Sequence, residues 1–218
     1  MVQSGPNLLQ VASRSAPGSL HPYEDRVLVD ERLGLFAIAD GVTNSSQGSG
    51  GVAAELVISL LRENFSGDVV SAINKVHQVA LTRREEDRTI GETTLTAVAI
   101  RGENLEAGNV GDSPAYLVKG GEMRSLIQED KSPYGYITQV IGYPETIRVH
   151  SAHSHLEESD LVIVASDGVE HVLHPSFIGP LANRAAASEI ADAIIGEARV
   201  NPAPYDDDKS VIVLRLLR

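Results

Sequence analysis

Three apolar runs that lead to an aspartate constrain the fold and the chemistry of this chain more than any other feature. Two of them, LGLFAIADGV and DLVIVASDGV, contain Asp40-Gly41 and Asp167-Gly168. In the third, LEAGNVGDSPAYLV, Asp112 lies between two stretches of alternating apolar residues. Runs of this length and composition predict buried β-strands. The chain is therefore expected to place a carboxylate at the end of several buried strands.

The length and composition favour one globular domain with an aliphatic core. The chain has 218 residues, of which 42% are apolar and only 4% aromatic. This length suffices for one substantial core and is short for two full domains. We expect a single domain over residues 1–218, with the Ser/Gly/Pro-rich residues 1–19 as a loose N-terminal arm or an irregular edge.

Charge and targeting signals exclude several classes of function. The net charge of −12 repels phosphate backbones and argues against nucleic-acid binding. The chain has no cysteine, which excludes a disulfide, a thiolate zinc site and a cysteine nucleophile. The N-terminus lacks a signal-peptide pattern, and no apolar run approaches the roughly 20 residues that span a bilayer. We expect a cytoplasmic protein that does not enter a membrane.

The order of the expected elements indicates an α+β fold. The expected ranges are 25–40 for a strand pair, 52–64 and 69–86 for two helices, 94–128, 146–156 and 160–166 for the middle strands, 185–199 for a third helix and 209–217 for a last strand. Residues 94–128 resemble an antiparallel meander of four strands with short turns. Because strands and helices do not alternate, we expect an antiparallel sheet with helices on its outer faces.

Acidic residues at the expected strand ends form the candidate site. They are Glu24, Asp25, Asp40, Asp112, Asp167, Asp206, Asp207 and Asp208. If these ends meet at one rim, about five carboxylates share a small volume and cannot all ionise without a counter-charge. Hard oxygen ligands without cysteine favour Mg²⁺ or Mn²⁺ over Zn²⁺. Carboxylates around two such ions suit the hydrolysis of a phosphate ester.

A single Asp-Gly pair is more often only a turn signal than part of a site. The repetition of aspartate after apolar runs, together with the acidic pair and triplet, favours the site. Gly41 and Gly168 are expected to let the chain turn sharply, and to let a carbonyl or a substrate come close.

A set of motifs in a consistent order resembles the metal-dependent protein phosphatases of the type 2C family. The motifs are YEDR, GLFAIADGV, GETTLTAVAI, NVGDSPAYLVKGGEM, QEDKS, ITQVIG, DLVIVASDGV and DDDKSVIVL, and together they cover roughly residues 20–217. The resemblance, to compact bacterial members, implies a β-sandwich of two antiparallel sheets flanked by helix pairs, a four-layer αββα arrangement. It also implies hydrolysis of phosphoserine and phosphothreonine in proteins by a hydroxide that bridges two Mg²⁺ or Mn²⁺ ions.

The resemblance assigns metal-binding roles to the first group of acids. Asp40 matches the residue that bridges the two metals, and Gly41 matches the residue that offers its carbonyl to one of them. Glu24 matches an acid that binds a metal largely through water, and Asp25 is its neighbour.

The remaining acids complete the site that the resemblance implies. Asp167 and Asp207 match the two other acids of the metal pair, so that Asp40, Asp167 and Asp207 are the expected catalytic residues. Asp112 matches the acid that holds a weaker third metal together with Asp167. Catalysis would rest on positioning and electrostatics, without a phosphoenzyme.

The chain departs from the family pattern at several positions. The arginine that usually grips the substrate phosphate is replaced by Leu20, and the adjacent His21 is the candidate to take over phosphate binding. A histidine that often follows Asp-Gly is Val42 here. Asp208 replaces the usual asparagine and adds a charge beside the metals. The flap is reduced to residues 133–136, which should leave the site more open.

Two further features carry less weight. His150, His153 and His155 could bind a metal only if all three converged, and solvent-facing histidines are the favoured interpretation. The loop 41–51 precedes a helix and could cradle a phosphate, but it lacks the lysine of a P-loop, so a mobile loop is favoured.

The favoured function is a protein serine/threonine phosphatase whose phosphoprotein substrate is made by an opposing kinase. Two alternatives stay open. One is a regulatory or binding module of the same fold with weakened catalysis, against which the complete set of acids argues. The other is a phosphatase for a small phosphate ester, which an open site would admit.

Overall fold

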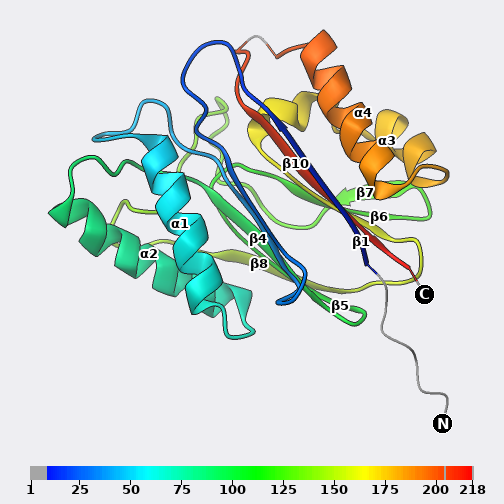
Figure 1. Ribbon diagram of the computed structural model, residues 1–218, viewed down its shortest axis with the longest axis horizontal. Helices are drawn as coiled ribbons and strands as arrows, with labels where there is room; N and C mark the ends of the chain where they lie inside the picture. The colour runs from blue at the N-terminus through cyan, green and yellow to red at the C-terminus, as the bar shows by residue number, and fades with distance from the viewer. Residues whose placement is uncertain (1–8, 204, 218) are drawn as a thin grey trace.

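Two five-stranded antiparallel sheets pack face to face between two pairs of helices in the computed structural model, which describes residues 9–203 and 205–217 (Figure 1). The first sheet contains, in spatial order, β1 (Leu9–Ala16), β10 (Lys209–Leu216), β9 (Leu161–Ala165), β6 (Ala115–Lys119) and β7 (Glu122–Ser125). The second contains β2 (Arg26–Asp30), β3 (Leu35–Ala39), β4 (Leu95–Arg101), β5 (Asn104–Val110) and β8 (His150–His155). The expected αββα sandwich is confirmed.

The helices cover the two outer faces of the sandwich. On one face lie α1 (Gly50–Asn64) and α2 (Val69–Glu86), and on the other lie α3 (Pro175–Ala182), α4 (Ala187–Val200) and the 3₁₀ helix η1 (Asp167–Val172). The expected break between the first two helices is confirmed, since the Asp68 side chain caps α2 by accepting from the Ser71 amide at 2.6 Å. The described residues contain no helix with the length and apolarity that crossing a membrane requires.

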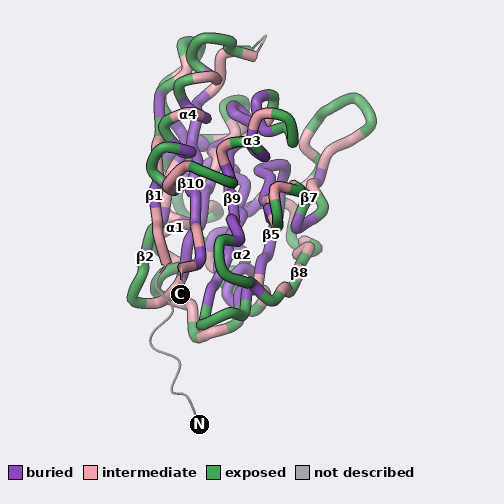
Figure 2. The backbone as a smooth tube through the Cα atoms, turned by 90° about the vertical axis from the view of Figure 1, so that its right-hand side faces the viewer, coloured by how far each residue is buried: buried purple, intermediate pink, exposed green. Residues whose placement is uncertain are grey.

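Three separate hydrophobic cores fill the spaces between the four layers. One lies between the sheets around Phe36 and Leu117, one between the second sheet and α1–α2 around Leu61 and Ile73, and one between the first sheet and α3–α4 around Ile194. The central strands are accordingly buried along nearly their whole length (Figure 2). Because β3 and β9 are buried on both faces, a polar group at their ends is held in a fixed position.

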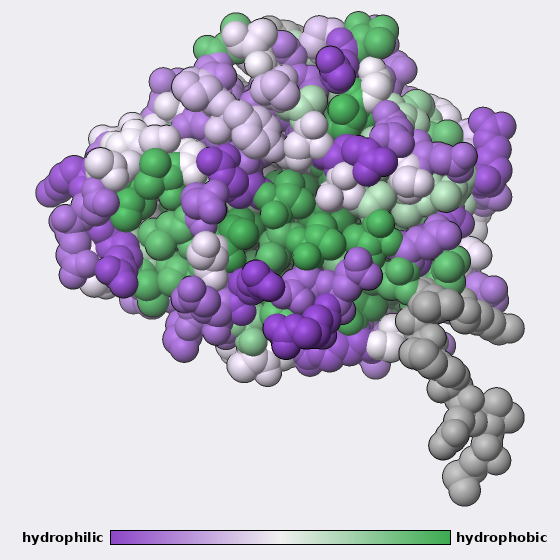
Figure 3. Space-filling view, viewed as in Figure 1, coloured by the Kyte–Doolittle hydropathy of each residue, from purple (hydrophilic) through white to green (hydrophobic). Residues whose placement is uncertain are grey.

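Apolar side chains also reach the surface along one side of the sandwich. In Figure 3 they form a band across the face between the two helix layers, where the edge strands β1 and β2 lie in Figure 1. Val29 of β2 is 38% exposed, whereas Val11 of β1 and Val27 of β2 are partly buried against the core between the sheets.

For the second half of residues 1–19 the loose arm is wrong, and the segment is instead a regular strand at the edge of the first sheet. Residues 9–16 form β1, which pairs with β10 from Leu9↔Leu216 to Ala16↔Lys209. The strand has few large apolar residues. It packs against the core beneath α4 through Ala12 and Ala16. Gly18 and Ser19 are also anchored, by hydrogen bonds to Asp208 and Asp206. Residues 1–8 of the expected arm lie outside the described residues.

The expected four-strand meander over residues 94–128 is also wrong. β4 pairs with β5 and β6 pairs with β7, but β5 and β6 belong to different sheets. The short link that carries Asp112 therefore crosses from one sheet to the other. A link of this length could equally form a hairpin within one sheet. Distant partners decide between the two arrangements, because β5 pairs with β8 and β6 pairs with β9.

Candidate metal centre

The acidic strand ends meet at one rim of the sandwich, around a cleft of about 560 Å³. Asp40 follows β3, Asp167 follows β9 and begins η1, Asp207 precedes β10, and Asp112 lies in the link between the sheets. All four line the cleft. The structure therefore brings these predicted residues together, and their individual roles stay predictions.

Burial and mutual repulsion perturb the carboxyls of this cleft. Burial raises the pKa of Asp40 well above its ordinary value, and the charges of Asp25, Asp167, Asp207 and Asp112 raise it further. Burial likewise raises the pKa of Asp25 and of Asp112 to about 7 each. For Asp167, burial and the charge of Asp207 raise the pKa, while a hydrogen bond with Asp40 opposes the rise. The acids are close enough to hinder one another's ionisation.

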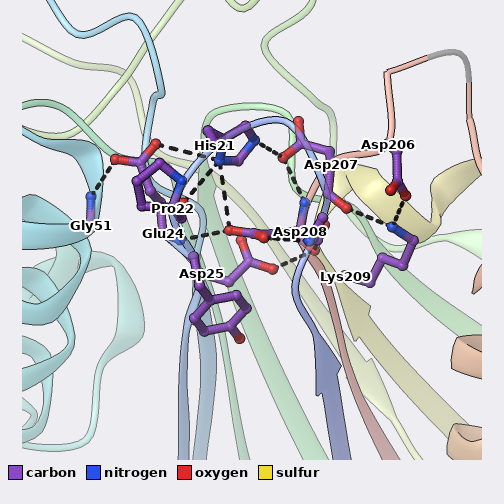
Figure 4. Close-up of polar contacts among 12 residues, drawn as sticks. His21, Pro22, Glu24, Asp25, Gly51, Asp206, Asp207, Asp208 and Lys209 are labelled. Atoms are coloured by element: carbon purple, nitrogen blue, oxygen red, sulfur yellow. Dashed lines mark hydrogen bonds and ion pairs between the residues drawn. The ribbon is translucent and has the colours of Figure 1, made fainter.

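The donor set fits hard divalent cations. Among the described residues that line the cleft, none is basic. Glu24 accepts at Oε1 from the Gly51 amide at 3.1 Å and the Ser49 hydroxyl at 3.2 Å, but its buried Oε2 has no hydrogen-bond donor (Figure 4). The buried Oδ1 of Asp25 has none either. Crowded carboxylate oxygens with unused lone pairs are the ligands that Mg²⁺ and Mn²⁺ prefer.

His21 lies beside the acids of the last strand. Its Nε2 is 2.8 Å from Asp207 Oδ1 and its Nδ1 is 3.8 Å from Glu24 Oε2 (Figure 4). Potential ligand atoms of His21, Asp207 and Asp208 all lie within 4.8 Å of one another. Burial lowers the pKa of His21, but the Pro22 carbonyl and Asp207 outweigh burial, so that the pKa is raised overall.

Asp208 holds two segments of the chain together. It is buried, and its carboxylate accepts from the Gly18 amide at 2.8 Å and from the Glu24 amide at 2.6 Å. These bonds tie the segment before β10 to the segment that leads into β2. Asp208 therefore fixes the position of Glu24 relative to Asp207, and its extra charge is largely satisfied by backbone donors.

Gly41 and Gly168 are required for close packing rather than for a sharp turn. Neither has a positive φ angle. A Cβ atom on Gly41 would lie 2.3 Å from the carbonyl carbon of Gly50, at the start of α1, and one on Gly168 would lie 1.9 Å from the Asp208 carbonyl oxygen. The expectation that a carbonyl comes close is thus right. At Gly168 this carbonyl belongs to Asp208, in the acidic segment before β10.

Hydroxyl side chains support the acids and were not predicted. The Asp40 amide donates to Thr94 Oγ1 at 3.0 Å, and Thr94 Oγ1 lies 2.8 Å from Ser113 Oγ. The Ser166 hydroxyl donates to Asp25 Oδ2 at 2.9 Å. Each of these residues stands next to an acid motif, in GETT, GDS and ASDG, and that adjacency is the signal that could have revealed them.

Two tyrosines at the mouth of the cleft were also not predicted. Tyr136, from the short loop 132–136, is 73% exposed, and Tyr205, from the segment before β10, is 78% exposed. Both residues line the cleft, and Tyr136 belongs to the segment that the sequence predicts as a short flap.

The three histidines of RVHSAHSHL do not converge. His150 is half-buried and lies 2.8 Å from Asp130 Oδ1, whereas His153 and His155 are exposed. Because side chains along β8 alternate in burial, this strand cannot bring a metal between all three. The interpretation of a site at these residues is not supported.

Comparison with known proteins gives a consistent family assignment. The sequence model of the protein phosphatase 2C family matches residues 19–197. The serine/threonine protein phosphatase PstP of Mycobacterium tuberculosis is 30% identical over 174 residues, which cover 75% of this chain and 32% of PstP. Probable protein phosphatase 2C 9 of Arabidopsis thaliana is 27% identical over 89% of this chain and 84% of its own length. The chain thus spans about a third of the length of PstP.

Solved structures share the fold at low sequence identity. The catalytic domain of PstP in complex with two manganese ions superposes with a TM-score of 0.83 at 23% identity, covering 97% of this chain and 100% of that one. PppA, described as a key regulatory component of the T6SS in Pseudomonas aeruginosa, has a TM-score of 0.83 at 20% identity, covering 96% and 98%.

Proposed function

The chain belongs to the protein phosphatase 2C family, and on that premise we propose that it hydrolyses phosphoserine and phosphothreonine in proteins with two Mg²⁺ or Mn²⁺ ions. The observation that carries the proposal is the cleft whose carboxylates at Asp40, Asp112, Asp167 and Asp207 converge with no basic residue among its described lining. The two manganese ions in the PstP catalytic domain support the same assignment. The substrate would be the product of a serine/threonine kinase.

The metal ions would be held by residues from both sheets. Asp40 would bind both ions, with Asp167 and Asp207 beside it, Glu24 at one side and the Gly41 carbonyl completing the set. When bound, the ions supply Lewis acidity toward the phosphoryl group and lower the pKa of a coordinated water. The chain itself supplies the fixed positions of these oxygens.

Three contacts orient the ligands that we propose. Asp40 is fixed through its backbone, because its amide donates to Thr94 Oγ1 and its carbonyl accepts from the Thr94 amide at 2.8 Å. The ring of His21 holds Asp207 Oδ1 at 2.8 Å. Partners of this kind set the direction of a ligand's lone pairs, and their loss typically lowers metal affinity or activity about 10–100-fold.

Phosphate binding would fall mainly on the ions. His21 is the predicted substitute for the family arginine, but its Nε2 already faces Asp207. We therefore propose that His21 acts first as a positioning residue for Asp207. The exposed rings of Tyr136 and Tyr205 at the mouth of the cleft would contact the residues that flank the phosphorylated side chain, which favours a peptide over a small ester.

One assay tests the proposed function. Hydrolysis of p-nitrophenyl phosphate and of a phosphothreonine peptide would be measured with Mn²⁺, with EDTA and in Asp40→Asn. We expect Mn²⁺-dependent turnover that EDTA abolishes and that Asp40→Asn lowers by roughly 100-fold or more. Asp30→Asn is a matched control, because Asp30 is also buried but pairs with Arg62 at 2.9 Å outside the cleft.

The same assay separates the alternatives. A protein that stays inactive with Mn²⁺ and with Mg²⁺ on both substrates would support a regulatory or binding module. Turnover of p-nitrophenyl phosphate without turnover of the phosphopeptide would support a phosphatase for small esters. Equal loss in Asp30→Asn and Asp40→Asn would mean that the effect arises from folding and not from the cleft.

A further inference from the structure

Lys131 is a half-buried cation at the base of the short loop 132–136. Its ammonium group hydrogen-bonds Glu170 Oε2 and lies 3.2 Å from Glu129 Oε2, and its side chain is only 24% exposed. A lysine held between two carboxylates in this way has a fixed position. This differs from most surface ion pairs, which constrain neither partner strongly.

The backbone and Glu129 place the Lys131 ammonium group near Asp112. The Asp130 amide donates to the Gly111 carbonyl at 2.8 Å, which continues the antiparallel register of β6 and β7 and sets Glu129 opposite Asp112. The Lys131 ammonium group, 3.2 Å from Glu129 Oε2, is therefore held on the side of Asp112.

Glu170, which binds Lys131, also places the Lys131 ammonium group near Asp167. Glu170 follows Asp167 by three residues within the 3₁₀ helix η1. Side chains three residues apart lie one above the other in a 3₁₀ helix, so Glu170 and Asp167 share a face. The ammonium group bound to Glu170 thus lies toward the face of η1 that carries Asp167.

The titration behaviour of both acids agrees with this placement. Burial and the charge of Asp167 raise the pKa of Asp112, and the charge of Lys131 opposes that rise. Burial and the charge of Asp207 raise the pKa of Asp167, and Lys131 again opposes the rise.

We propose that the Lys131 ammonium group is a tethered counter-ion for Asp112 and Asp167, and that it competes there with a divalent cation. The inference rests on the proposed metal centre and concerns the side of the cleft away from Glu24 and His21. The metal pair at Asp40 and Asp207 would then fill at Mn²⁺ concentrations that leave the Asp112–Asp167 position without an ion. The Lys131 side chain would therefore weaken the binding of the third ion that the family resemblance implies.

Counting bound Mn²⁺ tests this directly, without an activity measurement. Wild type and Lys131→Met would be titrated with MnCl₂ by calorimetry, with free Mn²⁺ followed by electron paramagnetic resonance. We expect two tight sites in wild type, and in Lys131→Met a third site at least about tenfold tighter than any third site in wild type. The reason is that a unit charge a few ångströms from a divalent ion repels it by several RT even at an effective dielectric constant of about 20.

Controls locate the effect. Lys131→Arg keeps the charge and should titrate as wild type, and so should Lys119→Met, which removes a lysine paired with Asp160 at 3.0 Å outside the cleft lining. Adding Asp112→Asn to Lys131→Met should remove the third site again. If Lys131→Met does not fold, Lys131→Gln keeps a donor toward Glu170 and carries the same expectation.

The outcomes separate this inference from the proposed function. A third site of unchanged affinity in Lys131→Met, or three equally tight sites in wild type, would overturn the role of Lys131 and leave the metal centre intact. A third site gained equally by Lys119→Met would also overturn it, because the cause would then be net charge. Wild type that binds no Mn²⁺ would overturn the proposed metal centre itself.

Discussion

Two groups of buried carboxylates in this protein differ in the donors that surround them. Glu92 and Asp130 are only 4% and 7% exposed, and each accepts hydrogen bonds from three donor groups. The donors are the Ser46 amide, the Ser46 hydroxyl and Arg84 for Glu92, and the Gly111 amide, Gln139 and His150 for Asp130. These acids connect loops to strands, and their burial is compensated.

The acids in and beside the cleft are less completely compensated. Asp25 is fully buried, yet Ser166 reaches only one of its oxygens and the other has no donor. Burial raises the pKa values of Asp40 and Asp112, and neighbouring carboxylates raise them further. The comparison shows that burial alone does not mark a functional acid. A buried oxygen without a donor at Asp25, and repulsion by neighbouring carboxylates at Asp40 and Asp112, distinguish this group, and both create a demand for cations.

Divalent cations should have the largest effect on the free energy of unfolding. They would give the cleft acids the compensating partners that Glu92 and Asp130 already have. At a free Mn²⁺ concentration about 1,000-fold above Kd, each site adds about 4 kcal/mol to the free energy of unfolding. Thermal unfolding with EDTA and with MnCl₂ measures the shift. Asp40→Asn should lose most of the gain and Asp30→Asn should keep it. An equal gain in both variants would mean that Mn²⁺ binds outside the cleft.

Substituting a compensated acid should have the next largest effect, which is a loss in the free energy of unfolding. Glu92→Ala leaves Arg84, whose side chain is only 12% exposed, without its carboxylate partner, and removes the acceptor of the Ser46 amide. Losing one partner of a buried pair costs about 3–5 kcal/mol. Unfolding in urea, with EDTA present, measures the loss.

A solvent-exposed pair provides the control for Glu92. Glu55 pairs with Arg26 at 2.6 Å, but the Glu55 side chain is 67% exposed. Glu55→Ala should therefore cost no more than about 1 kcal/mol. If the two variants lost equal stability, the distinction between buried, compensated acids and ordinary surface acids would not hold.

The sequence predicted the elements whose signal is local. The apolar runs that become β3 and β9 are bounded by the Asp-Gly pairs that mark their ends, so both strands and both acids were predicted together. β1 was missed because its small and polar residues are buried only by distant partners, the strand β10 nearly 200 positions away and the helix α4. The assignment of β5 and β6 to one sheet failed because sheet membership is decided by β8 and β9 and not by the link itself.

The same limit applies to the site. The acids could be predicted because their type and spacing carry the chemistry. The groups that position them could not, because Thr94 reaches Asp40 across 54 positions and Ser166 reaches Asp25 across 141. A residue type such as serine or lysine occurs throughout the chain, and its role here depends on which acid the fold places beside it.

Apart from the surface control at Glu55, the smallest expected effect is the pH dependence of the metal-free protein. The pKa of Asp112 is about 7 in the folded state, above the ordinary value of 3.8. Between these values the folded state retains a proton that the unfolded state has lost, so the contribution of Asp112 to stability falls as the pH rises from about 4 to 7. In EDTA, Asp112→Asn should therefore stabilise the protein at pH 8 by roughly 2 kcal/mol, or several degrees in Tm.

Comparing the two proteins at two pH values tests this dependence. Because pH 5.5 lies about midway between the unfolded and folded pKa values of Asp112, the gain from Asp112→Asn should fall to roughly half of its value at pH 8. The measurement is Tm for both proteins at pH 5.5 and pH 8 in EDTA. Asp130→Asn is the matched control at a compensated acid, and should lower Tm at pH 8 because it replaces a carboxylate that accepts from Gly111, Gln139 and His150. If Asp112→Asn and Asp130→Asn changed Tm in the same direction at pH 8, the two groups of buried acids would not differ as the structure indicates.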